Sequence, residues 1–332
     1  MAEGRIFSGM RPSGRLHLGN YFGALANWVR LQDERADCYF AVADVHALTT
    51  LAGTDAVDEI HASTHDMVLD WLAAGLDPEK SVLFVQSHVP EVLTLHTLLS
   101  MNTPLGWLQR VPSFKERLRQ MGADEESVSY GLVGYPVLQT ADVILYKADR
   151  VPVGIDQVPH IELMREIVRR FNRLYGETFP EPQPLLTETP LILGIDGEAK
   201  MSKSLGNHIE LAASNDETGK QVRSMKTDPQ RQRRTDVGRP EVCNVYSLHK
   251  IFNPDKLDEI YHQCTHAEIG CVDDKQTLAD GINAYLAEFR ERRRELEAKP
   301  GYVADVLAAG AERAAVVAQA TIAEVYEKMG LR

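Results

Sequence analysis

Two lysines spaced three residues apart give the clearest indication of chemistry in this sequence. They occur in the run Lys200-Met201-Ser202-Lys203-Ser204, close to glycines on both sides. Two ammonium groups at this spacing could bracket a triphosphate and neutralise the charge that develops as pyrophosphate leaves. A solvated surface turn is the ordinary alternative for a run of lysine and serine.

A second motif is Pro12-Ser13-Gly14-Arg15-Leu16-His17-Leu18-Gly19-Asn20, which lies between a predicted strand and a predicted helix. His17 falls at the start of that helix, where unpaired N–H groups and the helix dipole favour phosphate. Gly19 would let a flat base approach the backbone where any side chain would collide. Each motif alone is modest evidence, and their order and context together predict a nucleotide site.

Short apolar runs that alternate with helical patterns must position these motifs. Strands are predicted at 5–8, 38–43, 81–85 and 151–153, and a helix at 54–74 between the second and third strands. Continuous apolar strands alternating with helices indicate a parallel sheet covered on both faces, the doubly wound α/β class. Such folds bind ligands beyond the carboxyl ends of their strands.

After about residue 190 the sequence no longer shows the short apolar runs that predict strands. Residues 187–197 contain proline and glycine and are typical of a connector, whereas 209–225 and 241–330 are mostly helical in pattern, including 276–296 and 303–329. We therefore expect a Rossmann-type α/β domain over 1–190 and a smaller all-helical domain over 191–332. The last helix could pack back on the first domain.

The composition is that of an ordinary globular chain. Of 332 residues, 44% are hydrophobic and 25% are charged. At this size about 75% of the unfolded surface is buried on folding. Four cysteines indicate no disulfide framework, the N-terminus lacks a secretory pattern, and the apolar runs are all shorter than a membrane span. We therefore expect a cytoplasmic protein that does not cross a membrane.

The net charge of −12 argues against a general nucleic-acid binder. Residues 220–239, however, hold seven basic side chains against Asp228 and Asp236, a local net charge of +5. A phosphate backbone responds to local charge, because the Debye length at physiological ionic strength is about 8 Å. A solvated helix face explains a second group equally well, namely Arg290, Arg292, Arg293 and Arg294. The charge distribution therefore allows a selective RNA partner.

The two motifs resemble the HIGH and KMSKS signatures of class I aminoacyl-tRNA synthetases, with His17-Leu18-Gly19-Asn20 as a variant of the first. Further blocks at 7–14, 135–142 and 153–157 narrow the resemblance to the tryptophanyl-tRNA synthetase family. The resemblance implies a Rossmann catalytic domain, a helical anticodon-binding domain and a homodimer. It also implies ATP with Mg²⁺, L-tryptophan and tRNA(Trp) as substrates and partners.

The same resemblance implies the residues that would bind ATP. His17, Lys200 and Lys203 would act on its phosphates as catalytic residues. Lys115 would join them, although it could equally belong to a charged helix face. The Mg²⁺ ion would ride on the phosphates and need no carboxylate cage. The other expected ATP contacts come from three parts of the sequence: Arg11, Pro12, Ser13, Gly19 and Asn20; Gly154, Ile155 and Asp156; and Leu191, Met201, Ser202 and Ser204.

Asp142 is the residue that we expect to select tryptophan. A carboxylate in an apolar stretch is costly unless a donor pairs with it, and an indole N–H is such a donor. A structural aspartate in a salt bridge or at an N-cap is the alternative. The remaining candidates for the amino-acid site, all of which could instead be core residues, are Phe7, His46, Tyr135, Gln139 and Val153.

Tyrosyl specificity is the runner-up, because a glutamine at position 139 also suits a tyrosyl enzyme. The small pair Thr140-Ala141 would instead leave space for a bicyclic ring. The wider blocks are of the tryptophan type and favour tryptophan.

Cys243, Cys264 and Cys271 resemble part of the four-cysteine iron–sulfur site that some family members carry. The six-residue gap between Cys264 and Cys271 matches that site, but Asp274 stands where the fourth cysteine would be. Cluster ligation normally takes four thiolates. A relic, or a role without a cluster, is therefore favoured over a bound iron–sulfur cluster.

Two other functions fit the predicted fold. A nucleotidyltransferase could make a small-molecule adenylate without RNA, but the helical domain and the complete KMSKS motif argue against it. A non-catalytic relative kept as a binding protein should have lost phosphate-site residues. His17, Gly19, Lys200 and Lys203 are all present, so an active synthetase is favoured.

Overall fold

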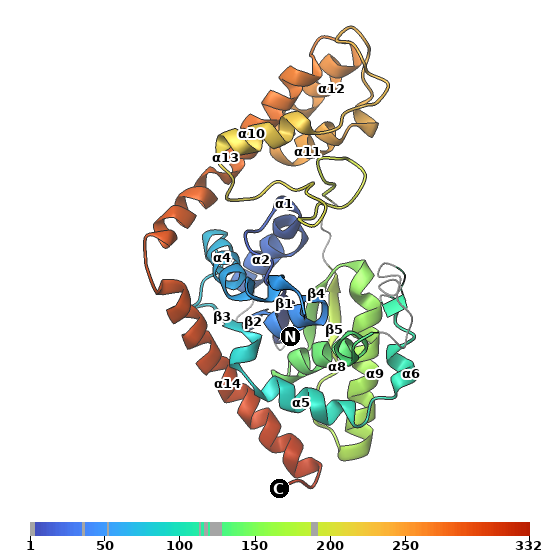
Figure 1. The fold of residues 1–332 in the computed structure, drawn as a ribbon, viewed down its shortest axis with the longest axis vertical. Coiled ribbons are helices and arrows are strands. Elements are labelled where there is room, and N and C mark those ends of the chain that lie inside the picture. The colour runs from blue at the N-terminus through green and yellow to red at the C-terminus, as the bar shows by residue number, and fades with distance from the viewer. Residues whose placement is uncertain are drawn as a thin grey trace.

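The computed structural model describes residues 4–34, 37–51, 53–112, 114, 115, 119, 128–186 and 192–332. Figure 1 shows an α/β part built around a sheet and a helical part at one end of it. Two long helices at the end of the chain leave the helical part and run back along the α/β part.

Five parallel strands form the sheet in the order β3-β2-β1-β4-β5. They are β1 (Ile6–Met10), β2 (Cys38–Val42), β3 (Ser81–Val85), β4 (Arg150–Val153) and β5 (Gln183–Leu186). Ile6 aligns with Cys38 on one side and with Arg150 on the other, so the chain order reverses beside β1. The parallel doubly wound sheet is confirmed. β5 was not predicted from the sequence, because it is four residues long, contains Pro184 and pairs only at the sheet edge.

Alternate residues of the strands face two separate cores. Ile6, Phe40 and Leu83 face the first core, and Phe7, Tyr39 and Phe84 face the second. The first core is covered by α2 (Ala26–Glu34) and α4 (Ile60–Ala73) and continues into the helical part. The second is covered by α5 (Glu91–Ser100), α8 (Tyr130–Leu145), α9 (Val158–Tyr175) and α14 (Tyr302–Lys328).

Short helices link the strands to these layers. The loop after β1 leads into α1 (Leu18–Asn20), which continues through a π-helical turn at Tyr21–Leu25 into α2. α3 (Asp44–Leu51) follows β2, and α6 (Leu105–Leu108) follows α5. The helix predicted at 54–74 begins only at Ile60, after a 3₁₀ turn, and ends before Gly75, whose φ of 111° no other residue readily adopts.

The helical part contains α10 (Asn215–Ser224), α11 (Asn244–Phe252), α12 (Leu257–Thr265) and α13 (Cys271–Glu297). The helix predicted from residue 209 begins at Asn215 because Ser214 and Glu217 form a capping box there. Residues 209 and 211 instead form backbone hydrogen bonds with Leu18 and Leu16. The helices predicted at 276–296 and 303–329 are confirmed as α13 and α14.

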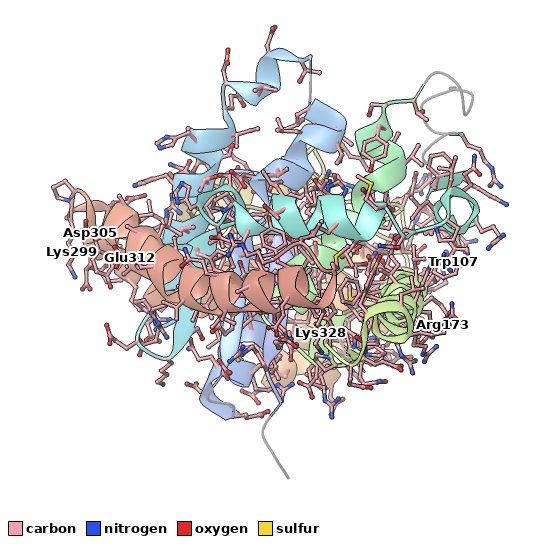
Figure 2. All side chains as sticks on the ribbon, turned by 90° about the horizontal axis from the view of Figure 1, so that it is seen from below. Trp107, Arg173, Lys299, Asp305, Glu312 and Lys328 are labelled. Atoms are coloured by element: carbon pink, nitrogen blue, oxygen red, sulfur yellow. The ribbon has the colours of Figure 1, made fainter. Side chains whose placement is uncertain are left out.

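α14 lies against β3 and α5, and Figure 2 shows it running alongside α5. Gly310 allows this approach, because a Cβ there would collide with the carbonyl oxygen of Leu83. By length and composition alone α14 could cross a membrane. Its packing over the second core explains why a helix of this α/β fold is so apolar.

Candidate active site

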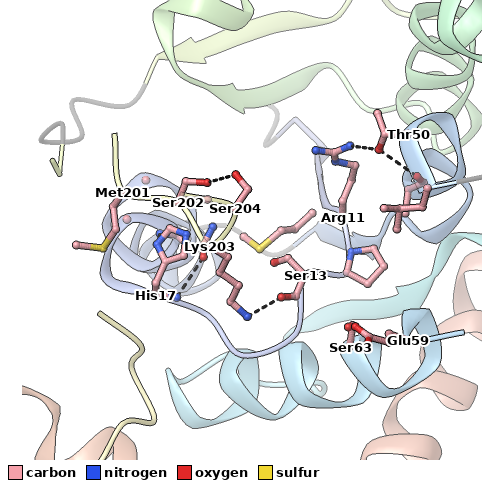
Figure 3. Close-up of a pocket in the computed structure, with 18 of the residues that line it drawn as sticks. Arg11, Ser13, His17, Thr50, Glu59, Ser63, Met201, Ser202, Lys203 and Ser204 are labelled. Carbon is pink, nitrogen blue, oxygen red and sulfur yellow. Dashed lines mark hydrogen bonds between the residues drawn. The ribbon is translucent and has the colours of Figure 1, made fainter. Parts of the chain in front are cut away.

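Three adjoining cavities lie at the carboxyl ends of the strands beside the point where the chain order reverses. The first, of about 790 Å³, lies between the loop after β1, α4 and the loop that contains the two lysines (Figure 3). The second, also of about 790 Å³, lies over the end of β4, and the third, of about 250 Å³, lies between α3 and α8. Shared lining residues connect them: Gly19 and Lys200 join the first to the second, and Gln139 joins the second to the third.

His17 lines the first cavity and caps α1. Its Nδ1 accepts a hydrogen bond from the Asn20 N–H at 3.3 Å, so the neutral ring carries its proton on Nε2. The backbone N–H of Asn20, one of the N–H groups at the start of the helix, is therefore already paired with the His17 ring. Burial first, and then electrostatic interactions with His208, Lys203 and Lys200, lower the pKa of His17 to about 4. At neutral pH the ring is an uncharged hydrogen-bond donor.

Gly19 is required by the packing around His17. A Cβ at this position would lie 3.0 Å from the His17 ring and 3.3 Å from the Cβ of Met201. Both distances are shorter than ordinary van der Waals contact. The glycine therefore lets the two predicted motifs pack against each other as well as leaving room for a ligand.

Lys203 reaches across to the loop after β1, where its Nζ donates to the Ser13 carbonyl oxygen at 2.6 Å (Figure 3). Burial lowers its pKa, while Glu210, Asp70 and Asp66 act in the opposite direction. Lys200 is exposed and lines both large cavities. Both lysines and His17 thus line the same cavity.

A buried asparagine supports the lysine loop. Asn207 accepts from the Ser202 N–H at 2.8 Å and donates to Asp196 at 2.7 Å. Gly194 leaves the space that the Asn207 side chain fills, because a Cβ there would collide with its amide. The loop conformation therefore depends on residues before and after the motif as well as on the motif.

The end of β4 carries a carboxylate at the mouth of the second cavity. Asp156 lies in a 3₁₀ turn (Ile155–Gln157) and accepts from Gln157 Nε2 at 2.7 Å. A Cβ on Gly154 would lie 2.6 Å from the Asp156 Oδ1. Glycine at this position allows the Asp156 carboxylate to turn back over the strand end, where it could accept hydrogen bonds from ribose hydroxyls.

The third cavity contains a buried acid. Asp142 Oδ2 pairs with His46 Nε2 at 2.8 Å, and its Oδ1 accepts from Gln86 Nε2 at 2.7 Å. Asp142 is 6% exposed and lines the cavity together with Tyr135 and Gln139, which share one face of α8 with it. A carboxylate has about four acceptor positions, so two partners leave capacity for a ligand donor.

Comparison with known proteins agrees with this geometry. The model of the family described as tRNA synthetases class I (W and Y) matches residues 2–287. The tryptophan–tRNA ligase of Thermotoga maritima is 47% identical over 329 residues, which cover 98% of this chain and 99% of that protein. The chain belongs to the tryptophanyl-tRNA synthetase family.

Solved structures of synthetases show the same relationship. The structure of tryptophanyl-tRNA synthetase from Campylobacter jejuni, complexed with ADP and tryptophan, superposes with a TM-score of 0.87 at 35% identity and covers 98% of this chain and 99% of that one. A tyrosyl-tRNA synthetase from Aeropyrum pernix reaches 0.67 at 18% identity, covering 93% of this chain and 90% of that one. At that identity the second similarity concerns the fold alone.

The structure brings most of the expected site residues of this synthetase to the three cavities. The first cavity is lined by Arg11, Pro12, Ser13, His17, Gly19, Asn20, Lys200, Met201, Ser202, Lys203 and Ser204, and the second by Phe7, Gln139, Val153, Gly154, Ile155 and Asp156. Phe7 and Val153 thus line the second cavity and not the third, which Asp142 lines. Lys115 is exposed and lines none of the three cavities. Leu191 lies outside the described residues.

One argument for tryptophan over tyrosine was wrong in its geometry. Thr140 and Ala141 were expected to leave room for a bicyclic ring, but both are fully buried within α8 and neither lines the third cavity. Their position follows from the helical period, which places residues 135, 139 and 142 on one face and turns 140 and 141 away from it.

Three polar residues of the site were not predicted from the sequence. Gln86 holds Asp142 and directly follows β3, Gln157 lines the second and third cavities, and His208 lies beside His17 with the two ring centroids 5.8 Å apart. Gln86 could have been found from its place just beyond the carboxyl end of a strand, where such sheets bind ligands. His208 had no local signal, because its partner is 191 residues away in sequence.

The donors near the three cysteines do not fit a four-thiolate cluster. Asp274, at the position of the missing cysteine, pairs with the buried His249 at 3.1 Å. The Arg231 guanidinium lies 3.5 Å from the Cys264 sulfur and also donates to the Ile269 carbonyl oxygen. Within the described residues, no group of three or more His, Cys, Asp or Glu side chains could hold a metal ion.

Proposed function

We propose that this synthetase is a tryptophan–tRNA ligase with its active site in the three adjoining cavities. It activates L-tryptophan with ATP to tryptophanyl-adenylate, releases pyrophosphate, and transfers the aminoacyl group to the 3′ end of tRNA(Trp). The observation that carries this proposal is the position of the Asp142 cavity beside a cavity lined by His17, Lys200 and Lys203. An amino acid held by its side chain at Asp142 can then present its carboxylate to an ATP phosphate.

Adenylate formation at this site needs positioning and charge stabilisation rather than a protein nucleophile. The tryptophan carboxylate attacks the α-phosphate, the bond from that phosphorus to the bridging oxygen breaks, and pyrophosphate leaves with its charge. Lys200 and Lys203 would meet that developing charge, and the His17 Nε2–H would donate to a phosphate oxygen. The Mg²⁺ ion that accompanies ATP would be held mainly by the phosphates.

Asp142 would select the amino acid through the indole N–H. Its two protein partners, His46 and Gln86, fix the orientation of the carboxylate before substrate arrives. A substrate that lacks the donor would leave a buried acceptor unpaired, and sites of this kind discriminate strongly.

The helical domain at 191–332 would read the anticodon. In the basic segment 220–239, Arg231 is buried and the guanidinium of Arg239 donates two hydrogen bonds to the buried carboxylate of Asp228. Arg239 lowers the pKa of that carboxyl to about 2. The side chains left exposed for a phosphate backbone are Lys220, Arg223, Lys226, Arg233 and Arg234.

The catalytic assembly would be a homodimer. Large apolar side chains are exposed on or next to α5, α6 and α8, namely Leu93, Met101, Leu105 and Tyr130. A second copy of this chain could cover them. Light scattering should then give twice the 37.1 kDa of one chain.

Pyrophosphate exchange into ATP, measured separately with tryptophan and tyrosine, tests the proposed activity. Exchange that depends on tryptophan is the expected result. Exchange with tyrosine instead would assign the third cavity to tyrosine. Exchange with neither amino acid would favour a non-catalytic binding protein and would contradict the proposal.

A further inference from the structure

A buried ion pair connects α4 to α13 directly behind the loop that carries His17. Asp70 of α4 is fully buried, and Arg293 of α13 is 3% exposed. Arg293 donates to Asp70, to Asp66 Oδ1 at 2.8 Å, and to Glu297 Oε1 at 2.9 Å. One guanidinium from the helical domain is thus enclosed by carboxylates from the α/β domain and from its own helix.

The other oxygen of Asp70 holds the backbone of the His17 loop. Asp70 Oδ2 accepts from the N–H of Leu16 at 2.5 Å, and Leu16 immediately precedes His17. The Leu16 carbonyl oxygen accepts from the Leu211 N–H at 2.9 Å, and the Leu18 N–H donates to Ile209 at 3.0 Å. The peptide groups on both sides of His17 are therefore tied to distant parts of the chain.

Burying two charged groups carries a desolvation cost, and a single backbone N–H does not need a charged acceptor. A neutral acceptor would serve Leu16 equally well, and apolar side chains often replace a buried ion pair without loss of stability. This pair imposes a specific arrangement, because it joins Leu16 to Asp70 and Arg293. The charge of Asp70 also acts on Lys203, so its influence reaches both motifs of the ATP site.

We propose that Asp70 and Arg293 are positioning residues for ATP activation. The pair fixes the Leu16 peptide, and through it the His17 ring and Gly19, and it makes ATP binding depend on how α13 is seated against α4. The inference rests on the proposed function for the reaction that the site performs. The role inferred for the pair concerns ATP and not the choice of amino acid. An experiment can therefore contradict this inference or the proposed function separately.

The test compares full-length variants that differ in what they remove. Asp70→Asn keeps an oxygen for the Leu16 N–H and removes the charge, whereas the double variant Asp70→Leu/Arg293→Met removes the acceptor and both charges together. Glu297→Gln is the matched control, because Glu297 pairs with the same arginine but lies on the same helix, is 42% exposed and makes no link to α4. Each protein is assayed for its affinity for ATP by calorimetry, tryptophan-dependent exchange, tryptophan affinity and melting temperature.

We expect the double variant to lose at least tenfold in ATP affinity or in the exchange rate, with tryptophan affinity within twofold of wild type. The ATP affinity and exchange rate of Asp70→Asn should lie between those of the double variant and wild type, and those of Glu297→Gln should match wild type. Wild-type ATP affinity and exchange in a folded double variant would overturn the proposal. Equal losses of affinity for ATP and for tryptophan would also overturn the proposal, since they would indicate a general structural role. A wild-type protein without tryptophan-dependent exchange would contradict the proposed function, while the ATP affinities would still decide the role of the pair.

Discussion

Lys203 and Ser13 are 190 positions apart in the chain, and the Lys203 Nζ donates to the Ser13 carbonyl oxygen over 2.6 Å. This hydrogen bond joins the two motifs that the sequence singled out. It also places the ammonium group in the wall of the first cavity before any phosphate is present. A triphosphate that enters the cavity can compete with the carbonyl oxygen for Lys203 as its charge develops.

Lys203→Ala should therefore lower the adenylation rate far more than it weakens tryptophan binding. Removing one preorganised charge donor of this kind costs about 10²–10³ in rate. Single-turnover adenylate formation and equilibrium dialysis of tryptophan measure the two quantities. Lys226→Ala is the control, because that exposed lysine lies outside the cavities and pairs with Glu198. Equal losses in rate and tryptophan affinity would instead indicate a folding defect.

Asp142→Asn should reduce discrimination for tryptophan by orders of magnitude and leave ATP binding nearly intact. The indole N–H would lose its charged acceptor, and the amide would present a donor to His46 or Gln86. Gln86→Leu should raise the KM for tryptophan roughly tenfold or more, because hydrogen bonds to charged groups contribute about 1.5–3 kcal/mol. Unchanged kinetics in both variants would remove Asp142 from the proposed amino-acid site.

ATP binding should be coupled to proton uptake by His17. Its pKa is about 4 in the free protein, below the ordinary 6.5, because of burial and the surrounding positive charges. Bound phosphates add negative charge and should raise this pKa, so uptake should occur between pH 4 and 6.5. Calorimetry of ATP binding at pH 5.5, in buffers of different ionisation enthalpy, measures the protons taken up. Subtracting the proton uptake measured with the His17→Asn variant removes the protons that ATP itself takes up. An identical proton uptake in both proteins would refute the coupling.

Reversing the exposed charges of the basic segment should impair the tRNA step alone. Arg233→Glu/Arg234→Glu should weaken tRNA binding and reduce its salt dependence, since each lost phosphate contact lowers the slope of log K against log salt by almost one. Tryptophan-dependent exchange should stay at the wild-type level. The double variant Lys80→Glu/Lys299→Glu, at two exposed positions outside the segment, controls for the same change of four in net charge. A wild-type KM for tRNA in the double variant would place the RNA elsewhere.

Protein purified without oxygen should show no absorbance band near 400 nm. Three cysteines supply too few thiolates for a cluster, Asp274 is committed to His249, and burial raises the pKa of the Cys243 and Cys264 thiols. Iron analysis of the same sample should give well below one atom per chain. A band together with stoichiometric iron would show that Asp274 or another group completes a cluster.

Much of the fold could be predicted because its signals are local. Buried strands such as β2 and β3 consist of consecutive apolar residues, and α13 and α14 follow the helical period for most of their length. β5 was not predicted because its extended conformation comes from pairing with β4 and not from a pattern in its own four residues. The start of α10 was placed too early, since residues 209–211 gain their partners from the loop before α1.

The residue types and spacing of the two motifs were enough by themselves to predict a nucleotide site, because phosphate chemistry needs paired cations and glycines at short range. Tertiary structure alone decided which side chains meet. It joined Lys203 to Ser13, placed Gln86 on Asp142, and buried Arg293 against Asp70 behind His17. None of these pairs is close in sequence, so no local pattern records them. They exist because strand order and helix packing bring distant segments to the same end of the sheet.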